Sequence, residues 1–237
     1  MFNVYPLNSE LVVHEIATQL ISPDLLEHIS DLWEEEEKRS NGSLFNGQIF
    51  SLYEREGDKL SGWFVEYRWW IAQRLDSSLF KKLQISPLAV SGLLRLGEEI
   101  VFGRRSLEMT QDPGFWELPP SGGIGYECRR PNNTIAPEHQ IAIELEEELH
   151  ISSNVIQSLV PFALVEDKTN NVYDIAYEIV LDITAEEVLK HQFEKTNNSE
   201  YIELQLISIK EFAYFLEKEK NRISPVTIEL LKLRKII

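Results

Sequence analysis

Three glutamates, Glu144, Glu147 and Glu148, fall within five consecutive residues of this sequence. On an α-helix, residues three or four positions apart share a face, so these carboxylates would point to the same side. Negative charges this close together repel one another unless water hydrates them well or a cation lies between them. Oxygen-only ligands suit a hard divalent ion such as Mg²⁺ or Mn²⁺. The spacing is therefore typical of either an exposed acidic helix face or a metal site.

The elements around the glutamates are expected to position them. Residues 137–149 predict an acidic amphipathic helix, whose apolar side turns towards the core. Upstream, residues 115–118 predict a short strand, and the Pro-Pro-Ser-Gly-Gly segment at 119–123 predicts a turn. Its glycines, Gly122 and Gly123, permit tight backbone geometry and the close approach of a ligand or a neighbouring chain.

Together these features resemble the Nudix hydrolase family. The box of that family is a glycine, five residues, a glutamate, seven residues, then Arg-Glu-Φ-x-Glu-Glu-x-Gly-Φ, where Φ is aliphatic. A hairpin over residues 93–105 that ends in Gly-Arg-Arg, and the segment 114–119, look like the usual approach to the box. The residues that match the box are Gly123, Glu144, Leu145, Glu147, Glu148 and Ile151.

The spacing of the match departs from the family pattern. Gly123 and Glu144 lie about six positions farther apart than the box allows, and residues 127–134 are expected to form the inserted loop. When the helix is taken as the reference, Ile135 stands where the first glutamate should be.

Two further departures lie in the helix itself. Ile143 replaces the arginine, which in the family usually orients a metal-binding glutamate through an ion pair. Arg129 or Arg130 from the insertion is a candidate substitute for that arginine. His150 replaces the closing glycine, and we expect it to end the helix at a positive φ, which costs histidine little.

The resemblance implies a Mg²⁺- or Mn²⁺-dependent pyrophosphohydrolase, in which water attacks a phosphorus of a nucleoside diphosphate linked to another moiety. Metal ions neutralise such a diphosphate and lower the pKa of a bound water. The resemblance implies Glu147 and Glu148 as metal ligands, and Glu144 as a further ligand or as the group that orients the water. A general base is expected elsewhere in the fold, with Glu200 as the candidate. Three other carboxylates compete for that role: Glu166, Asp167 and Glu178.

Other residues are candidates for binding the substrate. Arg104 and Arg105 end a predicted strand near the expected cleft, and the planar fork of one guanidinium would suit a phosphate. Either of them could instead face solvent or pair with acidic side chains. Trp116 could stack on a base, although a tryptophan in a short buried strand more often belongs to the core. Gly122 and Gly123 complete this set.

The long N-terminal extension and the stretched, incomplete box are similar to the UDP-glucose pyrophosphatase branch of Nudix proteins. This resemblance implies a nucleotide sugar such as UDP-glucose as a candidate substrate. Ile135 and Ile143, which are apolar at polar box positions, leave a second interpretation open, a catalytically weakened nucleotide-binding or regulatory module. A third interpretation is a scaffold whose N-terminal unit forms a homodimer.

Composition excludes several other classes of protein. The chain has 237 residues with 39 acidic and 23 basic side chains, a net charge of −16. Binding to nucleic acid or to an anionic membrane is disfavoured, because each needs clustered lysine and arginine. The single cysteine, Cys128, excludes a disulfide framework and a cysteine-rich zinc site. Without a secretory signal or a membrane-spanning apolar run, we expect a cytoplasmic protein.

Two units are expected along the chain. Residues 1–85 predict a small α+β extension, with a helix from Ser22-Pro23, a hairpin across 48–67 and a helix over 69–80. Residues 86–237 predict the Nudix-like hydrolase domain, with interleaved strands, the central acidic helix and two C-terminal helices. Strands interleaved with helices favour a mixed sheet covered on both faces. The expected fold class is therefore α+β, a Nudix-like α/β/α sandwich with a mixed sheet plus the N-terminal extension.

Overall fold

The computed structural model describes the whole chain except residues 19, 41–43, 110–111 and 192–199. An eight-stranded sheet runs in the order β1-β10-β11-β5-β6-β12, with β8 paired to β5 and β7 paired to β6. β11 and β5 run parallel, while β10 and β11 run antiparallel, so the sheet is mixed as expected. Its strands are β1 (Phe2–Pro6), β5 (Leu88–Leu96), β6 (Glu99–Arg105), β7 (Trp116–Glu117), β8 (Ser121–Gly123), β10 (Ile156–Asp167), β11 (Val172–Leu181) and β12 (Tyr201–Ser208).

This sheet is split in its middle. β5 and β6 pair through only two residue pairs, both next to the turn that joins them. Farther from the turn, β8 takes the place beside β5, and β7 takes the place beside β6. The expectation of a turn over residues 119–123 is therefore wrong for its last three residues. Ser121–Gly123 are extended because they pair with a stretch of β5 that β6 leaves free.

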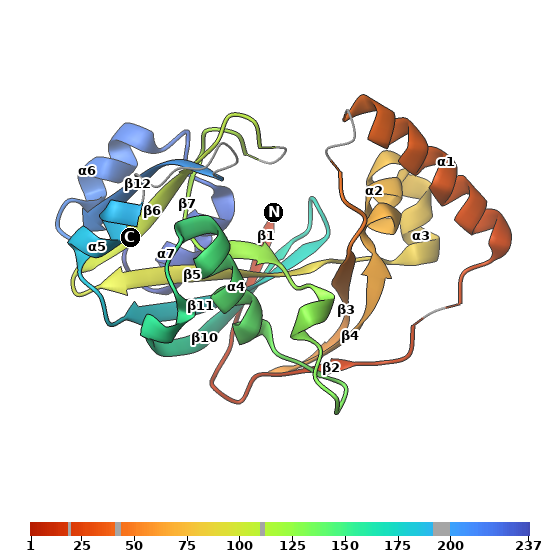
Figure 1. Cartoon of the computed structure of the whole chain (residues 1–237), viewed down its shortest axis with the longest axis horizontal. Helices are drawn as coiled ribbons and strands as arrows, with labels where there is room; N and C mark the ends of the chain where they lie inside the picture. The colour runs from red at the N-terminus through yellow and green to blue at the C-terminus, as the bar shows by residue number, and fades with distance from the viewer. Residues whose placement is uncertain (19, 41–43, 110–111, 192–199) are drawn as a thin grey trace.

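Helices cover both faces of the sheet (Figure 1), which confirms the predicted α+β sandwich with a mixed sheet. On one face, Leu145 and Leu149 are buried in the cluster that includes apolar side chains of β5 and β11. On the other face, Phe212 and Leu230 are buried with apolar side chains of β5 and β6. In the described part of the chain, none of the helices is long and apolar enough to cross a membrane. The helices are α4 (Pro137–Leu149), α5 (Ala185–His191), α6 (Phe212–Glu219) and α7 (Pro225–Leu233).

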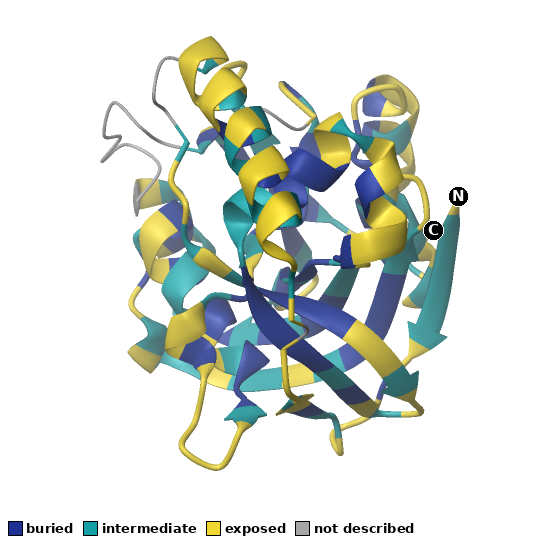
Figure 2. Ribbon diagram, turned by 90° about the vertical axis from the view of Figure 1, so that its right-hand side faces the viewer, coloured by how far each residue is buried: buried dark blue, intermediate teal, exposed yellow. Residues whose placement is uncertain are grey.

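A second, four-stranded sheet in the order β3-β4-β2-β9 lies with three helices in the N-terminal part of the fold. The first of these helices packs Ile29 and Trp33 inward and exposes its opposite side (Figure 2). These elements are β2 (Val12–Glu15), α1 (Pro23–Arg39), β3 (Gln48–Glu56), β4 (Lys59–Glu66), α2 (Tyr67–Leu75), α3 (Phe80–Leu83) and β9 (Thr134–Ile135).

The single helix expected over residues 69–80 is wrong in extent. α2 ends at Leu75, and Asp76 is extended. The Asp76 side chain accepts a hydrogen bond from the backbone N–H of Ser78, which starts a short 3₁₀ turn before α3. A side chain that caps a new turn in this way competes with continuation of the preceding helix.

Strand pairing crosses the boundary that the sequence places at residue 85. β1, from the first few residues, pairs antiparallel with β10 at the edge of the large sheet. β9, from the insertion that precedes α4, pairs with β2 in the small sheet. Each of the expected units, 1–85 and 86–237, therefore contributes one strand to the sheet of the other. The boundary between them stays a prediction.

α4 ends as the sequence predicts. His150 has φ 55° and ψ 28°, which is the left-handed conformation that helix-ending residues often adopt. The backbone N–H of the next residue, Ile151, donates to the carbonyl of Leu145. The chain can thus leave the helix without glycine at this position, at the cost of some backbone strain.

Replacing His150 by glycine should raise the free energy of unfolding by about 0.5–1 kcal/mol, because glycine adopts a positive φ without a steric cost. Chemical denaturation of the two proteins measures this difference. The control is His139→Gly, which changes an exposed histidine inside α4 and should lower stability by about 0.5 kcal/mol. A loss of stability at both positions would show that His150 carries no strain.

Candidate active site

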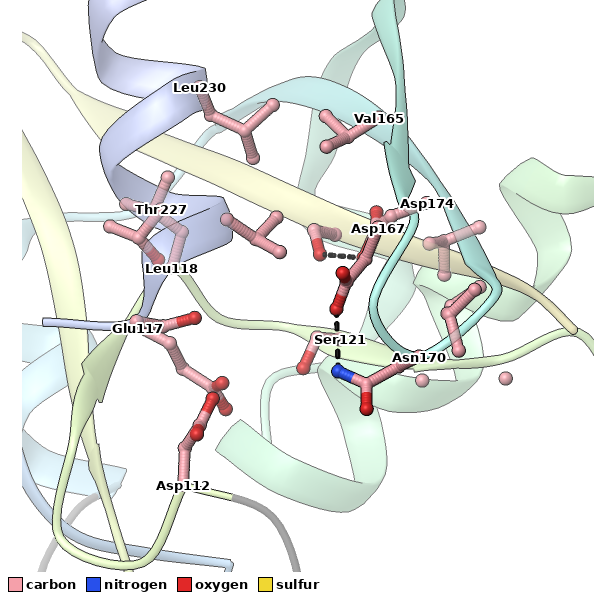
Figure 3. A pocket seen from close by; sticks show the side chains of 18 of the residues that line it. Asp112, Glu117, Leu118, Ser121, Val165, Asp167, Asn170, Asp174, Thr227 and Leu230 are labelled. Atoms are coloured by element: carbon pink, nitrogen blue, oxygen red, sulfur yellow. Dashed lines mark hydrogen bonds between the residues drawn. The ribbon is translucent and has the colours of Figure 1, made fainter. Parts of the chain in front are cut away.

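A cavity of about 580 Å³ lies at the split in the sheet. It is bounded by β5, β7, β8, β10, β11, α4 and α7, and α2 and β6 contribute one side chain each. Figure 3 shows acidic side chains entering it from several of these elements. The charged residues that line it are Arg74, Arg105, Asp112, Glu117, Glu144, Asp167, Asp174 and Glu200. The cavity is therefore strongly acidic, with two guanidinium groups among six carboxylates.

Glu148 lies in the last turn of α4 and is buried, with only 8% of its surface exposed. Its Oε2 accepts hydrogen bonds from the Ser121 backbone N–H at 3.0 Å and from the Tyr201 hydroxyl at 3.4 Å. Among the described residues, no group donates to its Oε1, which is also buried. Burial, followed by the charges of Glu200 and Glu144, raises the pKa of Glu148 well above its usual range.

Glu144 lies one turn before Glu148, against strand β8. Its Oε1 accepts a hydrogen bond of 2.8 Å from the Gln140 side chain. Burial, mainly, and the charges of Glu147 and Glu200 raise the pKa of Glu144 to about 7, although the Gln140 hydrogen bond acts in the opposite direction. A neutral or a cation-bound carboxyl group is therefore favoured here near neutral pH.

The glycine pair of β8 explains how Glu144 reaches this position. A Cβ atom at Gly122 would lie 1.7 Å from Glu144 Oε1, so a side chain there would displace the carboxylate. At Gly123, a Cβ would meet no described atom within 4 Å. Gly122 is thus required for the close approach of α4, whereas Gly123 leaves its side of the cavity open.

Glu147 lies on the exposed side of α4, and its charge still raises the pKa of Glu144. The helix therefore brings the three predicted carboxylates to adjacent positions, but with unequal burial. Glu144 lines the cavity, Glu148 lies inside the protein, and Glu147 faces solvent.

Arg105, Glu117, Glu200 and Tyr201 form a largely buried polar cluster beside the α4 glutamates. Nη1 of Arg105 forms an ion pair with Glu117 and another, at 2.9 Å, with Glu200 Oε1. The Tyr201 hydroxyl donates to Glu117 at 2.8 Å. Burial raises the pKa of Glu117, and the adjacent Arg105 opposes this rise. The structure thus brings the predicted residues Arg105 and Glu200 together with Glu144 and Glu148.

Two predicted substrate-binding residues lie elsewhere. The stacking role for Trp116 is wrong, because its side chain is 3% exposed and packs edge-to-face on Phe215. Its indole N–H donates to Glu219, so the alternative of a core tryptophan is confirmed. Arg104 is outside the cavity lining, where it pairs with Glu203 at 3.8 Å.

The competing candidates for the base have other partners. Glu166 accepts hydrogen bonds from Asn3 and Tyr5, and Glu178 pairs with Arg95 and Arg234. Asp167 does line the cavity, but its two oxygens accept from the Thr169 backbone and the Asn170 side chain. Of the four candidates, Glu200 is the one that lies in the cluster with the α4 glutamates.

The insertion does not restore the arginine that Ile143 replaces. Arg129 pairs with Glu15, and Arg130 pairs with Glu138, so both guanidinium groups form their ion pairs outside the cavity. Ile135 is paired with Val13 in the small sheet. The expected substitution by Arg129 or Arg130 is therefore wrong, and it is Ser121 and Tyr201 that hold Glu148 in place.

Among the residues that sequence reasoning missed, Arg74, Asp112, Glu117 and Asp174 line this cavity, and the buried Tyr201 contacts Glu117 and Glu148. Glu117 and Asp174 were detectable in principle, because each is an acidic residue with apolar neighbours on both sides in a strand. Arg74 and Tyr201 carry no such signal, since only the tertiary fold brings α2 and β12 to the α4 glutamates.

The carboxylate oxygens at this site suit a divalent cation. Within the described ranges, no group of three or more His, Cys, Asp or Glu side chains is already arranged as it would be around a metal ion. However, one buried oxygen of Glu148 has no hydrogen-bond partner among the described residues, and the pKa of Glu144 is raised. Both features indicate that a nearby cation would stabilise these carboxylates. Oxygen ligands of this kind are the ones that Mg²⁺ and Mn²⁺ prefer.

Comparison with known proteins agrees with this fold. No family model and no curated protein matches the sequence. Among solved structures, DR0079 from Deinococcus radiodurans is 17% identical over 80% of this chain and 98% of its own, with a TM-score of 0.51. At this identity, the likeness shows a shared fold.

Nudix proteins are also among the solved structures that the chain resembles. The NUDIX domain of Shewanella oneidensis NrtR, complexed with ADP ribose, is 12% identical over 68% of this chain and 96% of its own, with a TM-score of 0.43. A bifunctional NMN adenylyltransferase/ADP ribose pyrophosphatase from Francisella tularensis, complexed with AMP and Mn ion, is 14% identical. That match covers 70% of this chain and 48% of the other, with a TM-score of 0.44.

Without divalent ions, Glu144→Gln should stabilise the protein more at pH 8 than at pH 5. The raised pKa means that the folded state binds a proton more tightly than the unfolded state, so stability falls as pH rises from about 4.5 to about 7. Glutamine removes this loss, which is on the order of 2 kcal/mol between the two pH values. Urea denaturation in EDTA measures it.

The matched control is Glu147→Gln, which changes the exposed carboxylate on the same helix and should give little pH-dependent gain. A gain from Glu144→Gln that is equal at both pH values would contradict the raised pKa.

Proposed function

We propose that this protein is a Nudix-type pyrophosphohydrolase, dependent on Mg²⁺ or Mn²⁺, which cleaves the diphosphate of a nucleoside diphosphate linked to another moiety. One observation carries the proposal. A buried glutamate with a free oxygen, Glu148, lies beside Glu144 at an acidic cavity, on a helix whose sequence resembles the family's box.

Glu144, Glu147 and Glu148 would hold the metal. When bound, the ion would neutralise the diphosphate and lower the pKa of a water molecule. The backbone N–H of Ser121 and the hydroxyl of Tyr201 fix one oxygen of Glu148, which leaves the other oxygen to act as a ligand. This arrangement takes the role that the missing arginine has in the family pattern.

Glu200 is the proposed general base. It lines the cavity together with Glu144, and its charge raises the pKa of both Glu144 and Glu148. Arg105 holds Glu200 by an ion pair and so fixes its position. The proton of the attacking water passes to Glu200 as the oxygen adds to phosphorus. The bridging P–O bond then breaks, which releases a nucleoside monophosphate and the phosphorylated second moiety.

Arg74 is the proposed contact for the substrate's phosphates. Its exposed side chain reaches the cavity from α2 and packs over the ring of Trp70, 5.0 Å from the ring centroid. No carboxylate of the described chain forms an ion pair with it, whereas Arg105 is held by Glu117 and Glu200. A guanidinium at the mouth of an acidic cavity would attract an anionic substrate.

The finer proposal is a nucleotide sugar such as UDP-glucose as the substrate. A cavity of about 580 Å³ falls within the range of small-molecule sites. Asp174, a carboxylate that lines the cavity away from α4, would suit the hydroxyl groups and N–H groups of such a molecule. A homodimer and a cytoplasmic location remain predictions from the sequence.

The direct test is hydrolysis of a panel that contains ADP-ribose, UDP-glucose and dinucleoside polyphosphates, with Mg²⁺ or Mn²⁺. At least one compound should release a nucleoside monophosphate, detected by chromatography. The double variant Glu147→Gln, Glu148→Gln should lower kcat/KM at least about a thousandfold, because it removes metal ligands. Turnover of no compound, or unchanged turnover by the double variant, would refute the proposal.

The two glycines of β8 provide a matched pair of variants. Gly122→Ala should weaken Mn²⁺ binding about ten- to a hundredfold, because the added Cβ displaces Glu144. Gly123→Ala adds the same group where no described atom is near and should leave Mn²⁺ binding unchanged. Electron paramagnetic resonance titration measures both. Equal affinities would show that Glu144 does not contribute to the metal site.

One observation favours the second candidate, a nucleotide-binding module without efficient chemistry. Ile143 occupies the position of the box arginine, and neither Arg129 nor Arg130 replaces it. Such a module would bind nucleotides equally well with and without Mg²⁺, and calorimetry combined with product analysis distinguishes it from the enzyme.

A further inference from the structure

Asp174 occupies the part of the cavity away from the α4 glutamates. Its Oδ2 accepts a hydrogen bond of 2.7 Å from the Ser91 hydroxyl. Its Oδ1 is buried, and no group in the described ranges donates to it. An unpaired buried carboxylate oxygen is costly, so such a group in a cavity is a candidate for satisfaction by a ligand.

The strand register places Asp174 relative to the candidate active site. Asp174 on β11 pairs with Ala89 on β5, and Ala89 pairs with Gly123 on β8. Two strand spacings, roughly 10 Å, therefore separate the backbone of Asp174 from that of Gly123. Gly123 follows Gly122, against which Glu144 lies.

One side of the surroundings of Asp174 is apolar. Val165 is its antiparallel neighbour on β10, and Val172 lies two residues earlier on the same face of β11. Val226 and Leu230 of α7 line the cavity as well (Figure 3 labels Leu230). A carboxylate beside an apolar wall, in a cavity whose other lining includes polar side chains, suits a group with apolar faces and a polar edge, which is the character of a nucleobase.

We propose that Asp174, held by Ser91, binds an N–H donor on the base of the nucleotide substrate and so determines which base the protein accepts. The proposal rests on the proposed function, because it assumes that a nucleotide occupies the cavity. A carboxylate oxygen accepts hydrogen bonds and donates none, so Asp174 selects bases that present an amino or imino N–H and rejects edges that present only acceptors.

The protonation state of Asp174 agrees with this role. Burial raises the pKa of Asp174 to about 6, and the Ser91 hydrogen bond limits this rise. The group is therefore ionised at neutral pH and acts as an acceptor. Glu117 also raises this pKa, so the charges at the two ends of the cavity influence each other.

Asp167 provides a matched control at the same cavity. Asp167→Asn removes the same charge, but both oxygens of Asp167 already accept hydrogen bonds from within the protein. Asp174→Asn keeps a carbonyl oxygen for the Ser91 hydroxyl and turns the free acceptor into an N–H₂ donor. The two variants therefore separate loss of charge from loss of the free acceptor.

The test is calorimetric titration of wild type and both variants with AMP, GMP, UMP and CMP in the presence of Mg²⁺. For the nucleotide that binds best, Asp174→Asn should weaken binding about ten- to a hundredfold, as expected for a hydrogen bond to a charged group. Asp167→Asn should change binding less than about threefold. An equal loss in both variants would overturn the proposal.

A second measurement uses wild type and does not depend on how the variants fold. An analogue of the preferred nucleotide with its base N–H replaced by N–CH₃ should bind wild type about as weakly as Asp174→Asn binds the parent nucleotide. The two losses should not add when variant and analogue are combined. If 2′- or 3′-deoxy analogues show this behaviour instead, the donor is a ribose hydroxyl and the assignment to the base is overturned.

Binding and hydrolysis distinguish the two proposals. Nucleotide binding that depends on Asp174, without turnover of any compound, would refute the proposed function and leave the base contact supported. Turnover that Asp174→Asn leaves unchanged for every base would overturn the base contact alone. If none of the four nucleotides binds to wild type, the base contact is also overturned.

Discussion

Repulsion among carboxylates at the split in the sheet is the interaction on which the rest of the structure depends. Glu148 is buried, the charges of Glu144, Glu117 and Glu200 all raise its pKa, and Arg105 offsets only part of this charge. In the protein interior such repulsion is weakly screened, so the cluster gains free energy when it takes up protons or a cation. A diphosphate cannot enter this environment unaided, because its charge has the same sign. The same negative charge attracts a metal ion and repels an anionic substrate. Binding of the substrate would therefore depend on the bound ion.

The split sheet makes this concentration of charge geometrically possible. A continuous sheet would leave no room for polar side chains between β5 and β6, because backbone hydrogen bonds would join these strands along their length. Here β8 contributes a backbone N–H to Glu148, and its Gly122 lets Glu144 lie against the strand. α4 approaches from one face of the sheet, whereas Asp174 and α7 meet on the other. One cavity therefore connects two faces that a closed sheet would separate.

The N-terminal part of the chain is joined to this arrangement by backbone pairing. The extra residues that separate Gly123 from Glu144 include β9, which pairs with β2 of the small sheet. The stretched spacing, which departs from the family's box, thus has a structural role: it docks the N-terminal unit. The same unit brings Arg74 of α2 to the cavity, so the docking also supplies positive charge beside an acidic site.

Local sequence determined α4, its three neighbouring carboxylates, the positive φ of His150 and the hairpin of β3 and β4. Helical periodicity, capping and turns depend on residues a few positions apart, and the sequence displays those directly. Tertiary structure alone decided that Ser121–Gly123 form a strand, and that Glu117 and Asp174 share a cavity with Glu144. Those outcomes depend on which strands lie side by side, and β11 and β8 are brought together only through β5. Residue types and spacing do not predict such pairings between distant segments, because many registers bury the same apolar side chains equally well.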